Sequence, residues 1–222
     1  MKEQQQDTEQ QQPLKYREEH ISCQYYASGQ EASIQIYEEK AYRAITKLNT
    51  EKNTLIFVFK GILHFTIANS VPREILAKEM FLLPAGNEFF GVAKTDVTVV
   101  TCYLTPDIAL CSQFTLKHLY QYAKTNGIAN ETSFAVLPIS NLLYQELEVT
   151  KTVMQTGVLC THYQQLKLDT ILLMLRAFHN KEELTTLFYP ILNDDFNFKT
   201  KILQLYSIDK NVNELIELTG LP

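Results

Sequence analysis

Between residues 32 and 105 the apolar positions form short runs that are typical of β-strands. The runs are rich in Val, Ile, Phe, Tyr and Thr, and turn residues such as Lys60-Gly61 and Pro84-Ala85-Gly86 separate them. Six segments fit this description: Ser33–Tyr37, Thr54–Lys60, Ile62–Ile67, Met80–Leu83, Glu88–Ala93 and Asp96–Leu104. Many short strands without helices between them indicate a β-sandwich or barrel.

After Pro106 the apolar spacing changes to that of helices, with one interruption. A first helix is predicted to end before Gly127. Its apolar stripe would consist of Ile108, Cys111, Leu116 and Leu119. Ser133–Leu137 fits one more short strand that closes the β layer. Four further helices are then predicted: Ile139 to about Gly157, about Cys160 to His179, Lys181 to about Tyr189, and Asp194–Tyr206. Pro190 ends the third of these.

The helix predicted from about Cys160 to His179 carries the most apolar stretch of the chain. Its run Ile171-Leu172-Leu173-Met174-Leu175 goes more than once round a helix, so it is apolar on all sides. One interpretation is packing against the β layer and the preceding helix. The other is a seam with a second copy of the chain, because monomers rarely expose large apolar patches. The seam would consist of Leu166, Thr170, Leu173 and Met174.

The last dozen residues predict a short capped helix that leads into a glycine turn. Asn211 is a good N-cap, Glu214 completes a capping box, and Gly220 suits the left-handed residue that ends a helix. The scaffold of this unit is Asn211, Val212, Glu214, Leu215, Leu218 and Gly220. It is the first half of a helix-turn-helix, whose second helix reads base edges in the major groove. The sequence stops at Pro222, so we expect the recognition helix to be missing; a natural end and an imposed boundary both stay open.

Composition narrows the functional classes. The 222 residues are 45% hydrophobic, enough for a sizeable core, and the formal net charge of -5 argues against a chain that grips DNA phosphates by itself. The four cysteines are widely spaced, and no export signal or membrane-length apolar run is present, so we expect reduced thiols and a cytoplasmic location. Residues 1–20 are a polar, glutamine-rich leader that we expect to be disordered.

The order of these segments resembles the AraC-type transcriptional regulators, in the form common in Bacteroidetes-like bacteria. Four stretches carry the resemblance: Asn53–Gly61, Glu79–Gly86, Leu187–Asn193 and Asn211–Leu221. The resemblance implies an α+β fold in which a cupin-like β-barrel, a jelly roll, senses a small molecule or mediates dimerisation. A helical linker and a DNA-binding domain with two helix-turn-helix units follow in the family.

The expected domains follow from that resemblance and from the apolar pattern. After the leader come a cupin-like barrel over 21–138 with a helical excursion near 107–126, a helical linker or dimerisation segment over 139–193, and the start of the helix-turn-helix domain over 194–222. The sequence would thus be truncated within the first helix-turn-helix unit.

The metal pattern of cupins is missing from the positions that should carry it. The glutamate position falls on Thr54, the first histidine positions fall within 47–50, and the last falls on Phe89. A divalent ion needs several converging N, O or S donors, so we predict no metal, no cofactor and no catalytic residues. The effector pocket that the resemblance implies would include Thr54, Ile56, His64 and Phe89. His64 also fits a solvent-facing structural histidine.

We therefore expect the sensor and dimerisation portion of an AraC-type DNA-binding regulator, not an enzyme. Its partners would be a second copy of the chain, a small-molecule effector and, only in a full-length form, DNA; no membrane is expected. The resemblance implies that an effector shifts a population of conformers. The alternatives are a metal-independent cupin enzyme and a stand-alone dimerisation module.

Overall fold

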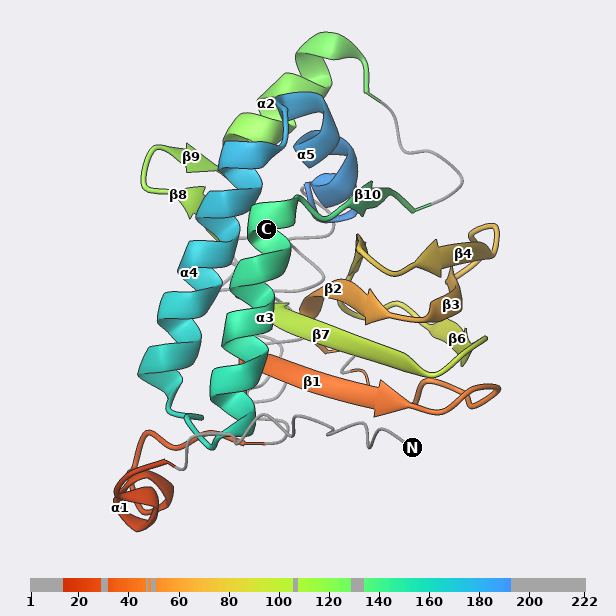
Figure 1. Cartoon of the computed structure of the whole chain (residues 1–222). Helices are drawn as coiled ribbons and strands as arrows, with labels where there is room; N and C mark the ends of the chain where they lie inside the picture. Colours follow the sequence, from red (N-terminus) through yellow and green to blue (C-terminus); the bar gives the residue numbers. More distant parts are fainter. Residues whose placement is uncertain are drawn as a thin grey trace, which may run out of the picture.

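The computed structural model describes residues 14–28, 32–46, 48, 51–105, 108–128 and 134–192. In this part of the chain a β-rich half precedes a helical half (Figure 1). The strands are β1 (Ile34–Glu39), β2 (Asn53–Lys60), β3 (Ile62–Ile67), β4 (Arg73–Leu76), β5 (Glu79–Leu83), β6 (Phe89–Ala93), β7 (Val97–Leu104), β8 (Ala109–Cys111), β9 (Phe114–Thr115) and β10 (Val136–Pro138). The helices are α1 (Arg17–Ile21), α2 (Leu116–Asn126), α3 (Asn141–Gln155), α4 (Thr161–Phe178) and α5 (Lys181–Phe188), and a 3-10 turn spans Tyr189–Ile191.

Two antiparallel sheets carry the β half. The larger has the order β1-β7-β2-β5-β10 and the smaller the order β4-β3-β6, while β8 and β9 form a separate hairpin. The predicted α+β class, with antiparallel strands followed by helices, is confirmed. The described strands form two sheets that share a core, and they do not close into one continuous barrel.

Strand β2 shows why the larger sheet is apolar on both faces. Its alternate residues Leu55 and Phe57 belong to a core that includes α3, α4 and α5. The residues between them, Ile56 and Val58, belong to a second core that includes β3, β4 and β6. Because side chains alternate across a strand, helices cover one face of this sheet and the smaller sheet covers the other.

Aromatic rings fill the space between the two sheets. Phe65 lies 4.8 Å from Phe81 and 5.2 Å from Phe89 by ring centroids, and the Phe81 ring lies 5.3 Å from Phe134. Among the described residues, a small cavity of about 10 Å³ lies beside Ile56. That is about the space of one water molecule.

On the other face of the larger sheet, α3 and α4 lie side by side (Figure 1). Lys167 of α4 donates to Glu146 of α3 at 2.7 Å, and both side chains are mostly buried. Ser140 caps α3 by accepting from the Leu143 amide. At one end of this helical layer, α5 packs against α2 and against β10. No helix in the described ranges is both long and apolar enough to cross a membrane.

Three predicted features differ from the structure. The segment with Ile108 and Cys111, predicted as helical, contains the β8–β9 hairpin, and α2 begins only at Leu116 after the capping residue Thr115. The hairpin and the predicted helix would bury the same apolar residues, so their spacing alone did not separate them. Strand β4 was not predicted because it buries one apolar side chain, Ile75. Helix α1 lies at the end of the leader that was expected to be disordered.

Candidate functional site

The residues predicted for an effector pocket occupy two different faces. Thr54 and Ile56 are fully buried on one face of β2, and Ile56 belongs to the core between the sheets. Phe89 packs against that same core through Phe65. His64 is partly buried on the opposite face of β3 from Leu63, and it pairs with Glu74 and Val92 on the neighbouring strands. Ile56 and His64 therefore do not face each other across the interior.

Of the positions expected for cupin metal ligands, Leu48, Thr54 and Phe89 lie among the described residues, whereas residues 47, 49 and 50 lie outside them. Thr54 is fully buried and its hydroxyl donates to the Lys52 carbonyl at 3.0 Å. Phe89 stacks on Phe65, and Leu48 packs into the core between the sheets. In the ranges that the structure describes, no three His, Cys, Asp or Glu side chains gather as a metal site would require.

The predicted dimer seam lies on α4, where the structure separates two apolar faces. Ile171, Leu172 and Leu175 are buried in the core. Leu166 and Leu173, two turns apart, are 64% and 54% exposed, whereas Thr170 and Met174 are partly buried. On the neighbouring α3, Leu142 is 53% and Val149 is 54% exposed. We call these four exposed side chains, Leu142, Val149, Leu166 and Leu173, the outer apolar face.

The helix-turn-helix scaffold lies outside the described residues. The predicted positions are Asn211, Val212, Glu214, Leu215, Leu218 and Gly220, and the helix predicted over Asp194–Tyr206 lies outside them too. Both remain sequence predictions.

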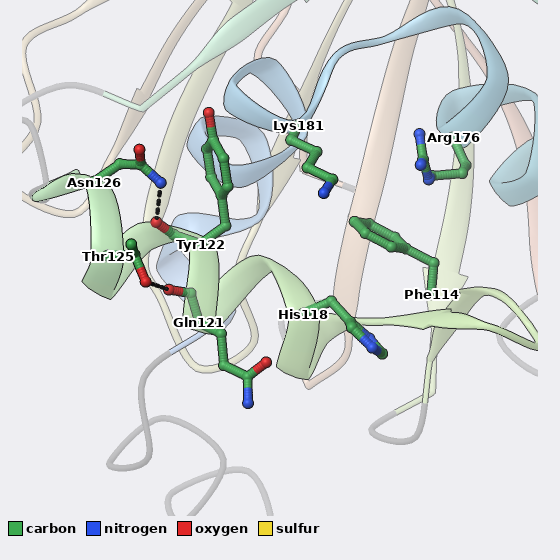
Figure 2. A pocket seen from close by; sticks show the side chains of 8 residues that line it. All are labelled: Phe114, His118, Gln121, Tyr122, Thr125, Asn126, Arg176 and Lys181. Carbon is green, nitrogen blue, oxygen red and sulfur yellow. Dashed lines mark hydrogen bonds between the residues drawn. The ribbon is translucent and has the colours of Figure 1, made fainter.

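A pocket that the sequence did not predict opens at the end of the helical layer (Figure 2). It has a volume of about 350 Å³. Four elements contribute its walls: β9, α2, the last turn of α4 and the first turn of α5. We call it the Phe114 pocket, and its lining residues are Phe114, His118, Gln121, Tyr122, Thr125, Asn126, Arg176 and Lys181.

Phe114 is the centre of the contacts in this pocket. The Arg176 guanidinium lies 4.4 Å from the centroid of its ring, and the Lys181 ammonium lies 6.0 Å from it. The His118 ring stacks beside Phe114 with centroids 5.4 Å apart and planes 17° apart. Figure 2 shows the Arg176 and Lys181 side chains both reaching toward the Phe114 ring. Cations near an aromatic face are attracted by the ring quadrupole.

Local sequence signals fix the walls of the Phe114 pocket. Thr115 starts α2 in a capping box with His118, whose Nδ1 accepts from the Thr115 amide at 3.1 Å. Asn180 starts α5 in a second capping box with Glu183, which holds Lys181 at the first position of that helix. The pocket joins residues more than 60 positions apart, so no local motif in the sequence could have marked it.

A second polar cluster lies on β1, at the edge of the larger sheet. The hydroxyls of Tyr37 and Tyr103 lie 3.0 Å apart and form a hydrogen bond, and both also contact the side-chain oxygen of Gln35. Burial, together with the hydrogen bond to Tyr103, raises the pKa of Tyr37 well above its usual value near 10. Tyr37 is therefore a neutral hydrogen-bonding group at physiological pH.

No protein-family model matches this chain, and no curated protein matches its sequence. Solved structures do match. The apo form of a ToxT variant from Vibrio cholerae is similar over 85% of this chain and 70% of that one, with 13% identity and a TM-score of 0.50. At this identity the similarity concerns the fold alone.

Two shorter matches cover about a third of this chain. A cupin superfamily protein from Desulfitobacterium hafniense covers 35% of this chain and 71% of its own, with 13% identity and a TM-score of 0.31. A conserved protein of unknown function from Streptococcus pyogenes matches 34% of this chain at 13% identity and a TM-score of 0.30. This chain spans 65% of that Streptococcus protein.

Proposed function

We propose that this chain acts as the sensor and dimerisation part of an AraC-type transcriptional regulator. Two observations support the proposal. The stretches that resemble the family occur in the family's order, and the fold is similar to that of ToxT, an AraC-family regulator. Fold similarity does not by itself establish a function, so the proposal needs support from a surface of this chain.

The outer apolar face is the observation that carries the dimerisation proposal. Leu142 and Val149 on α3, and Leu166 and Leu173 on α4, each leave more than half of their surface exposed. Each pair is spaced seven residues apart, so each lines one side of its helix. Two adjacent helices with exposed apolar stripes offer apolar surface that a second copy of the chain could bury in a two-fold symmetric dimer. Fully burying an exposed leucine contributes about 1.5–3 kcal/mol, and these half-exposed side chains would contribute roughly half of that each.

The test is the oligomeric state of the full 222-residue chain at micromolar concentration, measured by light scattering after size exclusion. We expect the wild type to be a dimer and the double variant Leu166→Glu/Leu173→Glu to be a monomer, because four buried carboxylates would meet at the interface. Circular dichroism should show an intact fold, since both side chains point away from the core.

Val71→Glu is the matched control. Val71 is a 60% exposed apolar residue in the loop before β4, on the other side of the larger sheet from the helices. It should leave the dimer intact. A wild-type monomer, or a dimer that survives the double substitution on α4, would contradict the proposed surface.

A stand-alone dimerisation module would use the same outer apolar face, and the sensor role separates the two functions. A sensor should change its dimer dissociation constant when its effector binds, whereas a pure dimerisation module should not. Titrating the wild-type dimer with candidate small molecules, with light scattering as the readout, distinguishes them.

A further inference from the structure

We propose that the Phe114 pocket binds a small organic anion that carries a carboxylate or phosphate group. The inference goes beyond the proposed function, because it places a ligand on the helical layer and not between the two sheets. It rests on the contacts of the pocket itself and stands whether or not the chain regulates transcription.

The first argument is the charge of the pocket lining. Arg176 and Lys181 both line the pocket, and none of its lining residues is a carboxylate. This is unusual for a chain with a net charge of -5. The charged pocket beside Lys40 shows the contrast, because there Glu38, Glu39 and Asp96 accompany two lysines.

Among the described residues, no carboxylate forms an ion pair with either of these two cations. The ion pairs in the described part of the chain are Lys40–Asp96 and Lys167–Glu146, and neither involves the pocket. The carboxylate of Glu183, close to Lys181 in sequence, accepts from the Asn180 amide in the capping box. Arg176 is partly buried, and its contact among the described residues is the Phe114 ring. A guanidinium has five N–H donors in a planar fork that matches a carboxylate or phosphate.

The third argument is the shape and chemistry of the remaining walls. The rings of Phe114, His118 and Tyr122 supply flat surfaces, and Figure 2 shows them around the opening together with the two cations. Gln121 on α2 adds an exposed amide. The volume of about 350 Å³ lies at the lower end of the range for small-molecule sites. These walls fit a small, flat ligand with one acidic group.

The packing around the Phe114 pocket fixes its walls. Phe114 is 8% exposed and belongs to the main core, so its ring is fixed. Its stacking on His118, and the two capping boxes that start α2 and α5, fix the surrounding backbone. A preformed site loses less conformational entropy on binding than a flexible surface does.

The test compares matched probes on the wild-type chain by protein-observed NMR titration at about 0.05 M salt, where screening is weak. Benzoate and phenyl phosphate carry the two candidate acidic groups on one ring. Benzamide is the neutral equivalent of benzoate, and inorganic phosphate is the anion without a ring. We expect at least one of the two aromatic anions to bind about tenfold more tightly than benzamide and than inorganic phosphate. One charge-assisted hydrogen bond raises the affinity by about tenfold.

Two substitutions locate the binding. Arg176→Gln and Lys181→Gln should each weaken the better aromatic anion about tenfold and leave benzamide unchanged. Lys94→Gln removes one positive charge at the exposed turn between β6 and β7, and it should leave both probes unchanged. Lys181 is exposed at the start of α5, so its substitution keeps the protein folded even if the Arg176 variant is unstable.

Three results would overturn the inference: no binding of either aromatic anion at millimolar concentration, equal binding of benzoate, phenyl phosphate and benzamide, or anion binding that Lys181→Gln does not weaken. If phenyl phosphate binds more tightly than benzoate, the acidic group is a phosphate; the reverse order assigns a carboxylate. None of these results depends on the oligomeric state, so they are independent of the dimerisation test.

Discussion

The buried side chain of Gln164 connects α4 to the segment before and at the start of β1, which is distant in the sequence. Its Nε2 donates to the carbonyls of Ala27 and Leu159 at 3.0 and 2.7 Å, and its Oε1 accepts from the amides of Ser33 and Ile34 at 2.7 and 3.1 Å. Its four hydrogen bonds hold the chain before β1 against α4. A buried polar group with all its partners is stabilising, whereas removing it leaves those partners unsatisfied.

We therefore predict that Gln164→Leu lowers the free energy of unfolding by about 3–5 kcal/mol, because up to four backbone groups lose their partner at once. Urea unfolding followed by circular dichroism measures the change. The neighbouring Gln165 is exposed and contacts Asp169 on its own helix, so Gln165→Leu should change stability by less than about 0.5 kcal/mol. Equal effects of the two substitutions would show that the four bonds carry little stability.

Tyr37 makes stability depend on alkaline pH. Its pKa is raised in the folded state by burial and by the hydrogen bond to Tyr103, so the folded protein holds this proton more tightly than the unfolded chain. The stabilising contribution is complete below about pH 10, the usual tyrosine pKa, and is lost as the pH rises above it. We predict that the urea midpoint falls more steeply between pH 9 and 11 in the wild type than in Tyr37→Phe. Parallel curves for the two proteins would contradict this.

At the scale of elements, sequence patterns located most strands and helices. The predicted limits of β3 are those observed, and the helix predicted from about Cys160 to His179 differs from α4 by one residue at each end. The pattern did not determine which face of α4 is buried, because Leu166 and Leu173 are as apolar as Leu168 and Ile171. Gln164 lies in the core because its partners Ser33 and Ile34 are 131 and 130 residues earlier in the chain, and no periodicity contains that information.

The candidate sites also depend on tertiary packing that the sequence pattern does not contain. The residues of the predicted effector pocket followed from a family pattern, and His64 lies on the face opposite the core between the sheets. The Phe114 pocket combines β9, α2, α4 and α5, whose packing is a tertiary property. A sequence reading could have noticed Arg176 and Lys181 near the boundary between two helices, but not the ring of Phe114 that they share.

The β2–β3 turn permits a test of backbone geometry. Gly61 has φ 86°, and an added Cβ would lie 2.3 Å from the Asp96 carbonyl oxygen. Gly127, which ends α2, has φ 64° and open space around the same position. We predict that Gly127→Ala costs about 1 kcal/mol, the left-handed penalty alone, and that Gly61→Ala costs at least about 2–3 kcal/mol because the clash adds to it. Urea unfolding of both variants gives the difference, and equal losses would exclude the steric contribution.

At the scale of the whole molecule, α4 connects the surfaces that carry the two proposals. Leu166 and Leu173 on α4 belong to the outer apolar face, Ile171 and Leu175 contact the core, and Arg176 reaches the Phe114 pocket. A rigid helix of 18 residues, about 27 Å long, thus joins a candidate interface to a candidate ligand site. The two sites can influence each other only if the ligand has different affinities for the monomer and the dimer.

The net charge of -5 leads to a prediction about nucleic acid. Phosphate contacts supply essentially all non-specific DNA affinity. An acidic chain is repelled by the phosphate backbone at short distances, where salt screens the charges little. We expect no binding of a random 30-base-pair duplex by up to about 10 μM of this chain at 0.15 M salt, measured by fluorescence anisotropy. Repeating the titration at 0.05 M salt is the control, because weak phosphate contacts would emerge there first. Micromolar binding that weakens steeply with salt would show a basic surface that the net charge conceals, and DNA recognition by this chain itself would then replace the pairing and sensing role.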